Sequence, residues 1–415
     1  MLKAGSLLYA IFISLIIGSI ATSFVLYSYY QKLRMAQYEG RIEAIERVHS
    51  AMNLLRTQEI KDFDPDKTYL FSRDEQAIQL QLEHWGGFYL ATAKTSFRQS
   101  SFQESVLLGY KNETPFALYL ADNNHPLSLC GDARVIGNSF IPQRGLKRAY
   151  IEGKSYSGKD LINGTKTTSE NKIPDLNDPL KDYLDRILLD GIPKEAHKVV
   201  SYNDVASEGV LESQQSFQDS TLCYYSPERI YLYDGKLKGR IIVKSEESIY
   251  LEGTVFAEDI LLIAPRIELA ANFKGSIHLI ASDTIIIGAY SELYYPSSIL
   301  LESKRERSAI IIQESAKIAG EVILYGTDNY TNKGVVSIKE AAELTGNVYS
   351  FDKVELRGKV KGSITCEKFI LKTSSSIYEN HLLDGVINAE EMPQEYLGIQ
   401  IKTSQRIRGI AKWLD

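Results

Sequence analysis

The stretch IYLEGTVFAEDILLIAPRIELAANFKGSIHLIASDTIII, residues 249–287, alternates short runs of Ile, Leu and Val with glycine and acidic turns. A unit of hydrophobic–x–Gly–x–hydrophobic occurs twice in it, as Leu251-Gly253-Val255 and Phe273-Gly275-Ile277. No helical period fits this pattern, whereas short strands separated by turns do. The stretch therefore predicts β-structure built from short strands.

The same unit recurs through the C-terminal half of the chain. Its further copies are Ile318-Gly320-Val322, Leu344-Gly346-Val348, Val360-Gly362-Ile364 and Leu383-Gly385-Ile387. Successive glycines are 22, 45, 26, 16 and 23 residues apart, and the 45 corresponds to two periods. Such a period is typical of a solenoid, in which each coil buries its apolar side chains only by stacking on its neighbours. A glycine fits the corner of a coil, where a Cβ would crowd the adjacent coil. We expect a parallel β-helix over residues 229–390, with a β-sandwich as the alternative.

Other segments are placed relative to this repeat. Residues 126–153 contain a glycine-punctuated stretch, Cys130 to Asn138, and are predicted to form the first coils. Residues 154–228 are polar and predict an insertion with a helix from Pro179 to Leu189. Residues 391–415 are expected to cap the C-terminal end.

Nothing in the sequence has the spacing of a known catalytic or metal site. The net charge is −6, the three cysteines lie far apart without a CxxC, and the six histidines are scattered. Four acidic residues recur at about one per coil: Asp259, Asp283, Asp352 and Glu367. They fit turns, which acidic residues favour, better than a catalytic row. The interpretation is that the chain is not an enzyme and needs no cofactor or metal, and the mildly acidic charge argues against a nucleic-acid partner.

The N-terminus has a different composition. From Ala4 to Tyr30 there are 27 consecutive residues without a charge, long enough to cross a bilayer core as a helix. Tyr27, Tyr29 and Tyr30 stand at its C-terminal end, where aromatic rings favour the membrane–water interface. A cleaved signal peptide is the alternative, but the uncharged run is longer than the apolar region of an ordinary signal peptide. We expect an uncleaved transmembrane anchor over residues 1–30.

Small residues recur at every fourth position of this anchor. They are Ser6, Ala10, Ser14, Gly18 and Thr22. In lipid, small side chains let two helix backbones approach closely, so this ladder is predicted to be an association surface. We expect a single-pass membrane protein, and the family resemblances given below imply a bacterial inner membrane. Positive charges after the run nominally favour a cytoplasmic bulk, but large domains translocate regardless of them, and a periplasmic bulk is preferred.

Residues 31–125 continue the helix and then change to strands. An apolar stripe along the helix comprises Tyr38, Ile42, Ile45, Val48, Met52 and Leu55. Alternating runs on both sides of Gly86-Gly87 predict a β-hairpin, and residues 105–108 and 116–120 are further strand candidates. A long helix, apolar and then amphipathic, followed by a small antiparallel sheet resembles type IV pilins and pseudopilins. The prepilin signature is incomplete, because Ala10 stands where that family has a glutamate.

The glycine repeat over residues 230–389 resembles the bactofilins, bacterial proteins that polymerise through a compact β-helical core. That resemblance implies a scaffolding role and assigns no functional residues. The expected fold is mainly β: a transmembrane helix, a small α+β pilin-like neck and a C-terminal parallel β-helix. The expected function is that of a membrane-anchored structural or assembly protein of the bacterial cell envelope, which uses the β-helix as a rigid interaction scaffold. A pilus-like or secretion apparatus is the setting that the pilin resemblance implies. Its expected partners are lipid, further copies or other anchored envelope proteins, and not a small molecule. An anchored polysaccharide-active enzyme or glycan-binding adhesin is the alternative.

Overall fold

The computed structural model describes residues 4–57, 69–73, 76–97, 100–112, 115–206, 208–304, 307–326, 333–400 and 406–415. The chain divides into two compact units, one of residues 1–81 with 92–104 and one of residues 82–91 with 105–415. The fold is mainly β with a long apolar N-terminal helix and a large parallel sheet, as the sequence predicts.

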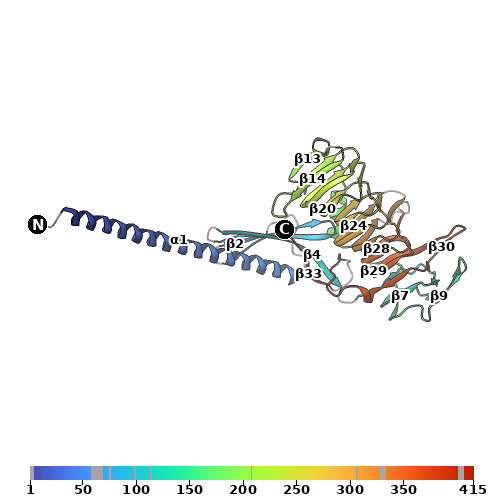
Figure 1. The fold of residues 1–415 in the computed structure, drawn as a ribbon. Coiled ribbons are helices and arrows are strands. Elements are labelled where there is room, and N and C mark those ends of the chain that lie inside the picture. Colours follow the sequence, from blue (N-terminus) through green and yellow to red (C-terminus); the bar gives the residue numbers. More distant parts are fainter. Residues whose placement is uncertain are drawn as a thin grey trace. The chain divides into compact units, whose positions relative to one another are not determined.

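The first unit is dominated by one unbroken helix, α1 (Ala4–Thr57). Figure 1 shows it as a single continuous rod from the N-terminus. Every residue from 5 to 39 is exposed, and burial begins at Gly40. Beyond that point Ala44, Val48, Ala51, Met52 and Leu55 are buried.

The predicted apolar stripe is correct in its second half only. Val48, Met52 and Leu55 are buried, but Tyr38 is 65% exposed and Ile42 is 39% exposed. The buried face runs instead through small residues, Gly40 and Ala44, which allow a neighbouring element to approach the helix closely.

An antiparallel sheet contains five strands in the order β1-β2-β3-β4-β33. Their bounds are β1 (Tyr69–Arg73), β2 (Gln76–Trp85), β3 (Phe88–Phe97), β4 (Ser100–Asn112) and β33 (Arg406–Leu414). The hairpin expected at Gly86-Gly87 is present between β2 and β3, and Gly86 has a φ of 59°, which suits glycine. β33 pairs antiparallel with β4, so the C-terminal residues form a strand of this sheet.

The parallel β-helix fills most of the second unit. One of its sheets contains β15 (Leu222–Ser226), β18 (Ile241–Ser245), β20 (Phe256–Ile263), β22 (Lys274–Ala281), β24 (Glu292–Ser303), β26 (Lys317–Gly326), β28 (Glu343–Leu356) and β29 (Lys359–Lys372). Another contains β16 (Ile230–Leu232), β19 (Ser248–Leu251), β21 (Arg266–Leu269), β23 (Thr284–Ile287), β25 (Ser308–Ile312) and β27 (Gly334–Ile338). Additional strands are β13 (Lys198–Ser201), β14 (Val210–Gln215) and β17 (Asp234–Gly239).

Branched side chains of successive coils stack in register inside the solenoid. One such column consists of Ile249, Ile267, Ile285, Ile310 and Val336, all fully or almost fully buried. Each fully buried side chain of this size contributes about 1.5–3 kcal/mol relative to an exposed one. The alternation of inward and outward residues along each strand therefore explains the Ile, Leu and Val content of the repeat.

The coils that come first in the sequence stack at the far end of the solenoid. β5 (Leu118–Leu120) pairs in parallel with β29, and β7 (Arg134–Ile136) pairs in parallel with β32 (Val386–Asn388). The short strands of this end are β6 (Leu127–Cys130), β8 (Ser139–Ile141), β9 (Leu146–Arg148), β10 (Tyr150–Ile151), β11 (Lys154–Ser155), β12 (Lys166–Thr168), β30 (Ile377–Glu379) and β31 (His381–Leu383). In Figure 1, β13 lies at one end of the stack and β7 and β9 at the other.

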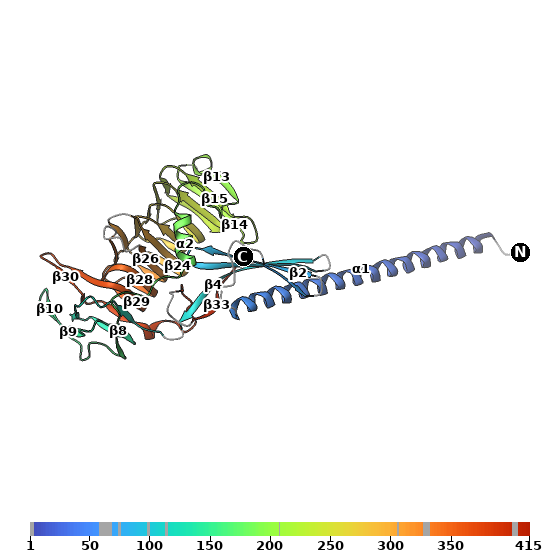
Figure 2. The same cartoon turned by 180° about the vertical axis from the view of Figure 1, so that it is seen from behind.

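The chain returns from one end of the stack to the other through residues 169–197, which contain α2 (Asp178–Ile187). The helix lies where the sequence places it, and the Asn177 side chain caps it by accepting from the Leu180 N–H. Leu180, Leu184 and Ile187 pack with outward residues of the first sheet, including Ile242 and Leu261. Figure 2 shows α2 beside β24. The described part of the unit also contains α3 (Tyr202–Val205) and a 3₁₀ turn (Ala389–Glu391).

Candidate functional site

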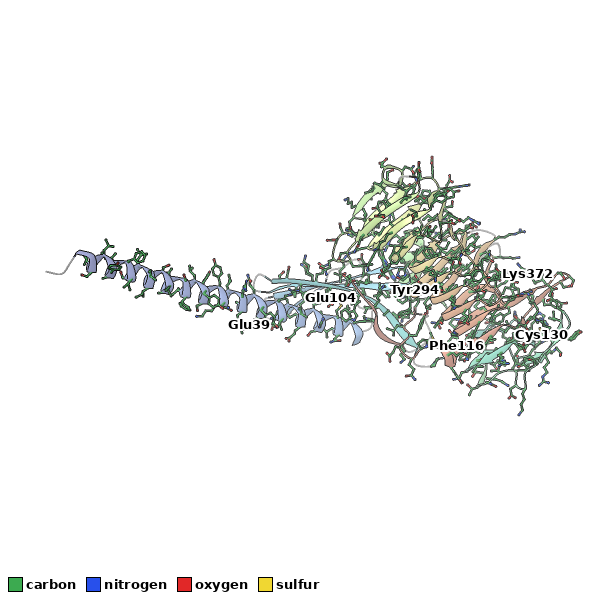
Figure 3. All side chains as sticks on the ribbon, in the orientation of Figure 1. Glu39, Glu104, Phe116, Cys130, Tyr294 and Lys372 are labelled. Carbon is green, nitrogen blue, oxygen red and sulfur yellow. The ribbon has the colours of Figure 1, made fainter. Side chains whose placement is uncertain are left out.

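The first candidate site is the exposed half of α1. Among the described residues, α1 is one helix long and apolar enough to cross a membrane, judged by length and composition. The side chains of residues 5–39 are exposed. Figure 3 labels Glu39, the last residue of this exposed segment. Tyr29 and Tyr30 form an edge-to-face pair with ring centroids 5.9 Å apart, and both are well exposed. Exposed tyrosines at the end of an apolar helix are typical of the membrane–water interface.

Three hydroxyl groups of this segment donate to the backbone of the helix itself. Ser14 donates to the Ile11 carbonyl at 2.8 Å, and Thr22 donates to the Gly18 carbonyl at 2.8 Å. Ser23 donates in the same way to the Ser19 carbonyl, at 2.9 Å. A hydroxyl bonded to its own backbone enters hydrocarbon at a much lower cost than a bare one.

The five small residues of the predicted ladder are Ser6, Ala10, Ser14, Gly18 and Thr22, and all are exposed on α1. A Cβ added at Gly18 would meet nothing within 4 Å, so the chain's own packing does not require this glycine. Residues four apart drift by only about 40° around a helix, so the ladder stays on one slowly winding face of α1. Membrane helices that pack through such small-xxx-small faces commonly cross at about −40°. The ladder's role stays a prediction.

The six repeat glycines have a different environment. They are Gly253, Gly275, Gly320, Gly346, Gly362 and Gly385, and at each an added Cβ would press on the carbonyl oxygen of another coil. Gly346 and Gly362 also have φ values of 143° and 151°, in the region that favours glycine. Gly346 lies on the Gly320 carbonyl and Gly362 on the Gly346 carbonyl, so these three glycines form a column.

The residue after each glycine of this column points outward and joins a hydrogen-bonded chain. Ser363 Oγ donates to Asn347 Oδ1 at 2.6 Å, and Asn347 Nδ2 donates to Glu321 Oε1 at 2.8 Å. Tyr396 Oη donates to the same Glu321 oxygen at 2.7 Å. Burial and the neighbouring Glu321 raise the pKa of Tyr396 well above its usual value, so its hydroxyl remains a donor. Glu321 itself is 2% exposed.

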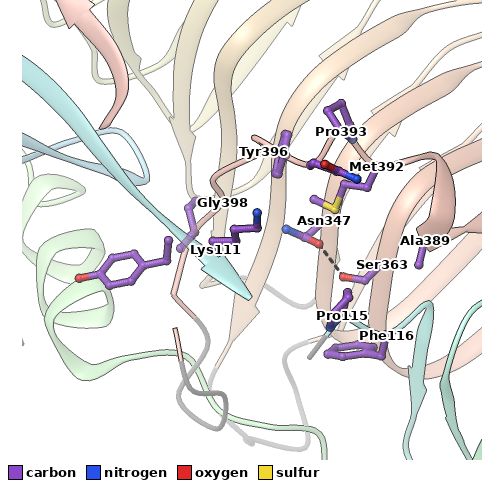
Figure 4. A pocket seen from close by; sticks show the side chains of 13 residues that line it. Lys111, Pro115, Phe116, Asn347, Ser363, Ala389, Met392, Pro393, Tyr396 and Gly398 are labelled. Atoms are coloured by element: carbon purple, nitrogen blue, oxygen red, sulfur yellow. Dashed lines mark hydrogen bonds between the residues drawn. The ribbon is translucent and has the colours of Figure 1, made fainter. Parts of the chain in front are cut away.

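A pocket of about 220 Å³ opens beside this chain (Figure 4). Asn347 and Ser363 contribute its polar side, and Lys111 of β4 contributes a cation. Its remaining side chains are mainly apolar or aromatic: Tyr110, Pro115, Phe116, Ala389, Met392, Pro393, Tyr396 and Ile399, with Gln394 and Gly398 also lining it. The sequence patterns do not predict this pocket. The sequence signal that could have indicated it is the polar residue directly after each of Gly320, Gly346 and Gly362.

The acidic residues of the repeat differ in their surroundings, and Asp283 is half-buried. Asp259 is buried at a bulge with a φ of 61°, and both its carboxylate oxygens accept from Lys412 Nζ at 2.8 and 2.7 Å. Asp352 also lies at a register shift and accepts from the Gly334 N–H at 2.9 Å. Glu367 is exposed. The first two therefore act as anchors of irregular backbone.

Other titratable groups are held in unreactive states. Burial lowers the pKa of His84 and of His278 to about 3, so both imidazoles are neutral. Burial raises the pKa of Cys130 to about 11 and that of Cys223 to about 12. In the part of the chain that the structure describes, no three His, Cys, Asp or Glu residues gather as metal ligands.

Comparison with known proteins identifies no family. No protein-family model matches the chain, and no curated protein matches it significantly in sequence. Among solved structures, the chain is matched to the competence-associated pilin ComZ from Thermus thermophilus, with 10% sequence identity and a TM-score of 0.27. The match covers 92% of this chain and 97% of that chain. A likeness at this level does not establish a shared fold.

Proposed function

We propose that the chain is a membrane-anchored structural protein of a bacterial cell envelope, with the N-terminal part of α1 as its single membrane-spanning segment. The observation that carries this proposal is the exposure of an uncharged helix surface over residues 5–30. Water-soluble monomers rarely expose apolar patches larger than a few hundred Å². Lipid is the environment that removes this surface from water.

The association role follows from the ladder. Gly18 has open space around it, and the hydroxyls of Ser14 and Thr22 are already bonded to their own helix. A partner helix can therefore approach the backbone closely without breaking a hydrogen bond. We take further copies of this chain or other anchored envelope proteins as the partners, in a pilus-like or secretion assembly.

The β-helix serves in this proposal as a rigid body presented by the anchor. Its core is a continuous stack of buried aliphatic residues, and its backbone hydrogen bonds link every coil to the next. The preferred location of this body is the periplasm, with the cytoplasmic face as the alternative.

The test is extraction of the full chain from membranes with alkaline carbonate. The unchanged protein is expected to stay in the membrane pellet. Replacing Ile13 and Ile17 by Asp places two charges near the centre of the span, each costing about 2.5–3.5 kcal/mol, and is expected to release it. The matched control replaces Met35 and Tyr38 by Asp. Both residues are exposed on the same helix beyond the span, so this variant is expected to stay in the pellet. Carbonate release of the unchanged protein contradicts the proposal.

A further inference from the structure

The pocket beside β28 and β29 combines features of a ligand site. It belongs entirely to residues of the second unit. Its volume of about 220 Å³ is below the roughly 300–1,000 Å³ of pockets for drug-sized ligands. It therefore has room for a single ring-sized group. Its polar side rests on the regular strands β28 and β29, which fix the positions of Asn347 and Ser363.

The direction of the hydrogen bonds shows what the polar side offers to a ligand. The Ser363 and Tyr396 hydroxyl protons are both used, one on Asn347 and one on the buried Glu321. The lone pairs of the two hydroxyl oxygens remain available as acceptors. Asn347 donates one of its two side-chain N–H groups to Glu321, so the other remains available as a donor. The pocket thus presents hydroxyl acceptors together with donors from Asn347 and Lys111. A ligand that carries several hydroxyl groups can donate and accept at the same time.

The other sides of the pocket are suited to the C–H faces of such a ligand. Phe116 and Tyr396 contribute aromatic rings, and Met392 and Pro393 contribute aliphatic surface. Figure 4 shows Phe116 with Pro115 at one end of the pocket and Met392 with Pro393 at the other. Pockets in general combine an apolar lining with a few placed polar groups that fix orientation.

We propose that this pocket binds one sugar ring of a glycan. The hydroxyls of the ring would bond with Ser363, Asn347 and Lys111, and its C–H faces would lie against the aromatic and aliphatic sides. The proposal goes beyond the membrane role, because removing sugar binding leaves α1 and its anchoring unchanged.

The test is ligand-observed NMR on the full chain in a detergent without a sugar headgroup, such as lauryldimethylamine oxide. The probes are cellobiose, lactose and N,N′-diacetylchitobiose, with N-acetylphenylalaninamide as an apolar competitor. At least one sugar is expected to bind with a Kd of about 1 mM or lower. Ser363→Ala and Phe116→Ala are each expected to weaken it by about tenfold, which corresponds to about 1.4 kcal/mol.

Two matched variants control for indirect effects. Tyr294→Ala removes an exposed aromatic residue that does not line the pocket, and Lys317→Ala removes an exposed lysine that does not line it. Lys111→Ala, in contrast, removes the lysine that lines the pocket. The first two are expected to leave binding unchanged, and the third to weaken it. Three results overturn the proposal: no sugar binding to the unchanged protein, sugar binding unaffected by the pocket variants, or preferential binding of the phenylalanine amide at the pocket.

Discussion

At the scale of single residues, Gly346 shows what the solenoid requires. A Cβ there would overlap the Gly320 carbonyl, and its φ of 143° strains any other residue. We expect Gly346→Ala to lower the free energy of unfolding by about 3 kcal/mol, because strain and steric overlap add. Chemical denaturation of the full chain measures this loss.

Gly153 provides the matched control for that prediction. Its φ of 80° is also positive, but a Cβ there would meet nothing within 4 Å. Gly153→Ala is therefore expected to cost only about 1 kcal/mol, from strain alone. Equal losses in the two variants would show that contact with the adjacent coil is not the reason for the repeat glycine.

Glu302 gives the protein a defined pH dependence. Burial, with Asp185 beside it, raises the pKa of Glu302 to about 7 from an ordinary 4.5, despite Lys304 at 3.3 Å. The folded state therefore binds the carboxyl proton of Glu302 more tightly than the unfolded state does. The stability that this proton binding contributes is full below pH 4.5 and is lost as pH rises through about 7. Glu302→Gln is expected to remove that loss, making the variant more stable by about 3 kcal/mol at pH 8 and equal at pH 4.

Glu355 supplies a control of opposite sign. Burial alone would raise its pKa, but hydrogen bonds from Ser337 and Lys339 outweigh burial and lower it. Its stabilisation is present above the ordinary pKa and is lost as pH falls. Glu355→Gln is therefore expected to destabilise the protein at pH 7, and denaturation midpoints that respond alike in both variants would refute this assignment.

The glycines and the residues that follow them mark the limit of prediction at this scale. A recurring Gly with hydrophobic neighbours is a local pattern, so the repeat is visible in the sequence. The chain formed by Glu321, Asn347 and Ser363 depends on the exact register between coils, which sets which outward side chains meet. Tyr396 joins it from a segment with no repeat pattern at all.

At the scale of elements, α1 carries the clearest prediction. Ser14→Leu with Gly18→Leu fills the ladder with bulky side chains and is expected to reduce crosslinking between helices in membranes at least several-fold. Ser19→Leu with Ser23→Leu also introduces two leucines at the same spacing, on a neighbouring face, and is expected to leave crosslinking unchanged. Identical yields from both pairs would remove the ladder as an association surface.

The elements differ in how well the sequence predicts them. α2 and the hairpin are found close to their expected positions, because a capping residue, an apolar stripe and a Gly-Gly turn are local signals. The sequence predicts a strand at residues 116–120 beside the antiparallel hairpin, but β5 instead pairs in parallel with β29 of the solenoid. β33 pairs with β4 across some 300 residues of sequence, which no local pattern indicates.

At the scale of the whole molecule, the order of the coils differs from their order in the sequence. β5 to β9 stack beyond β29 and β32, and the chain then returns through α2 to begin the other end at β13 (Figure 1). Composition and period predict a stack, but every coil offers a similar inner face, so stacking order is set by pairings between distant segments. The mainly β fold and the apolar N-terminal helix were predictable, because each follows from a residue pattern within a single segment and not from pairings between distant segments.

The most direct measurement of membrane anchoring is cysteine accessibility along α1 in native membranes. The three natural cysteines are buried and their thiol pKa values are raised, so they give a low background. Ser14→Cys lies within the proposed span, and Glu39→Cys lies beyond it on the same exposed helix. A membrane-impermeant maleimide is expected to label Glu39→Cys from one side only and to leave Ser14→Cys unlabelled until the membrane is dissolved and the protein denatured. Labelling of Ser14→Cys in intact membranes as fast as Glu39→Cys would contradict the proposal that α1 spans the bilayer.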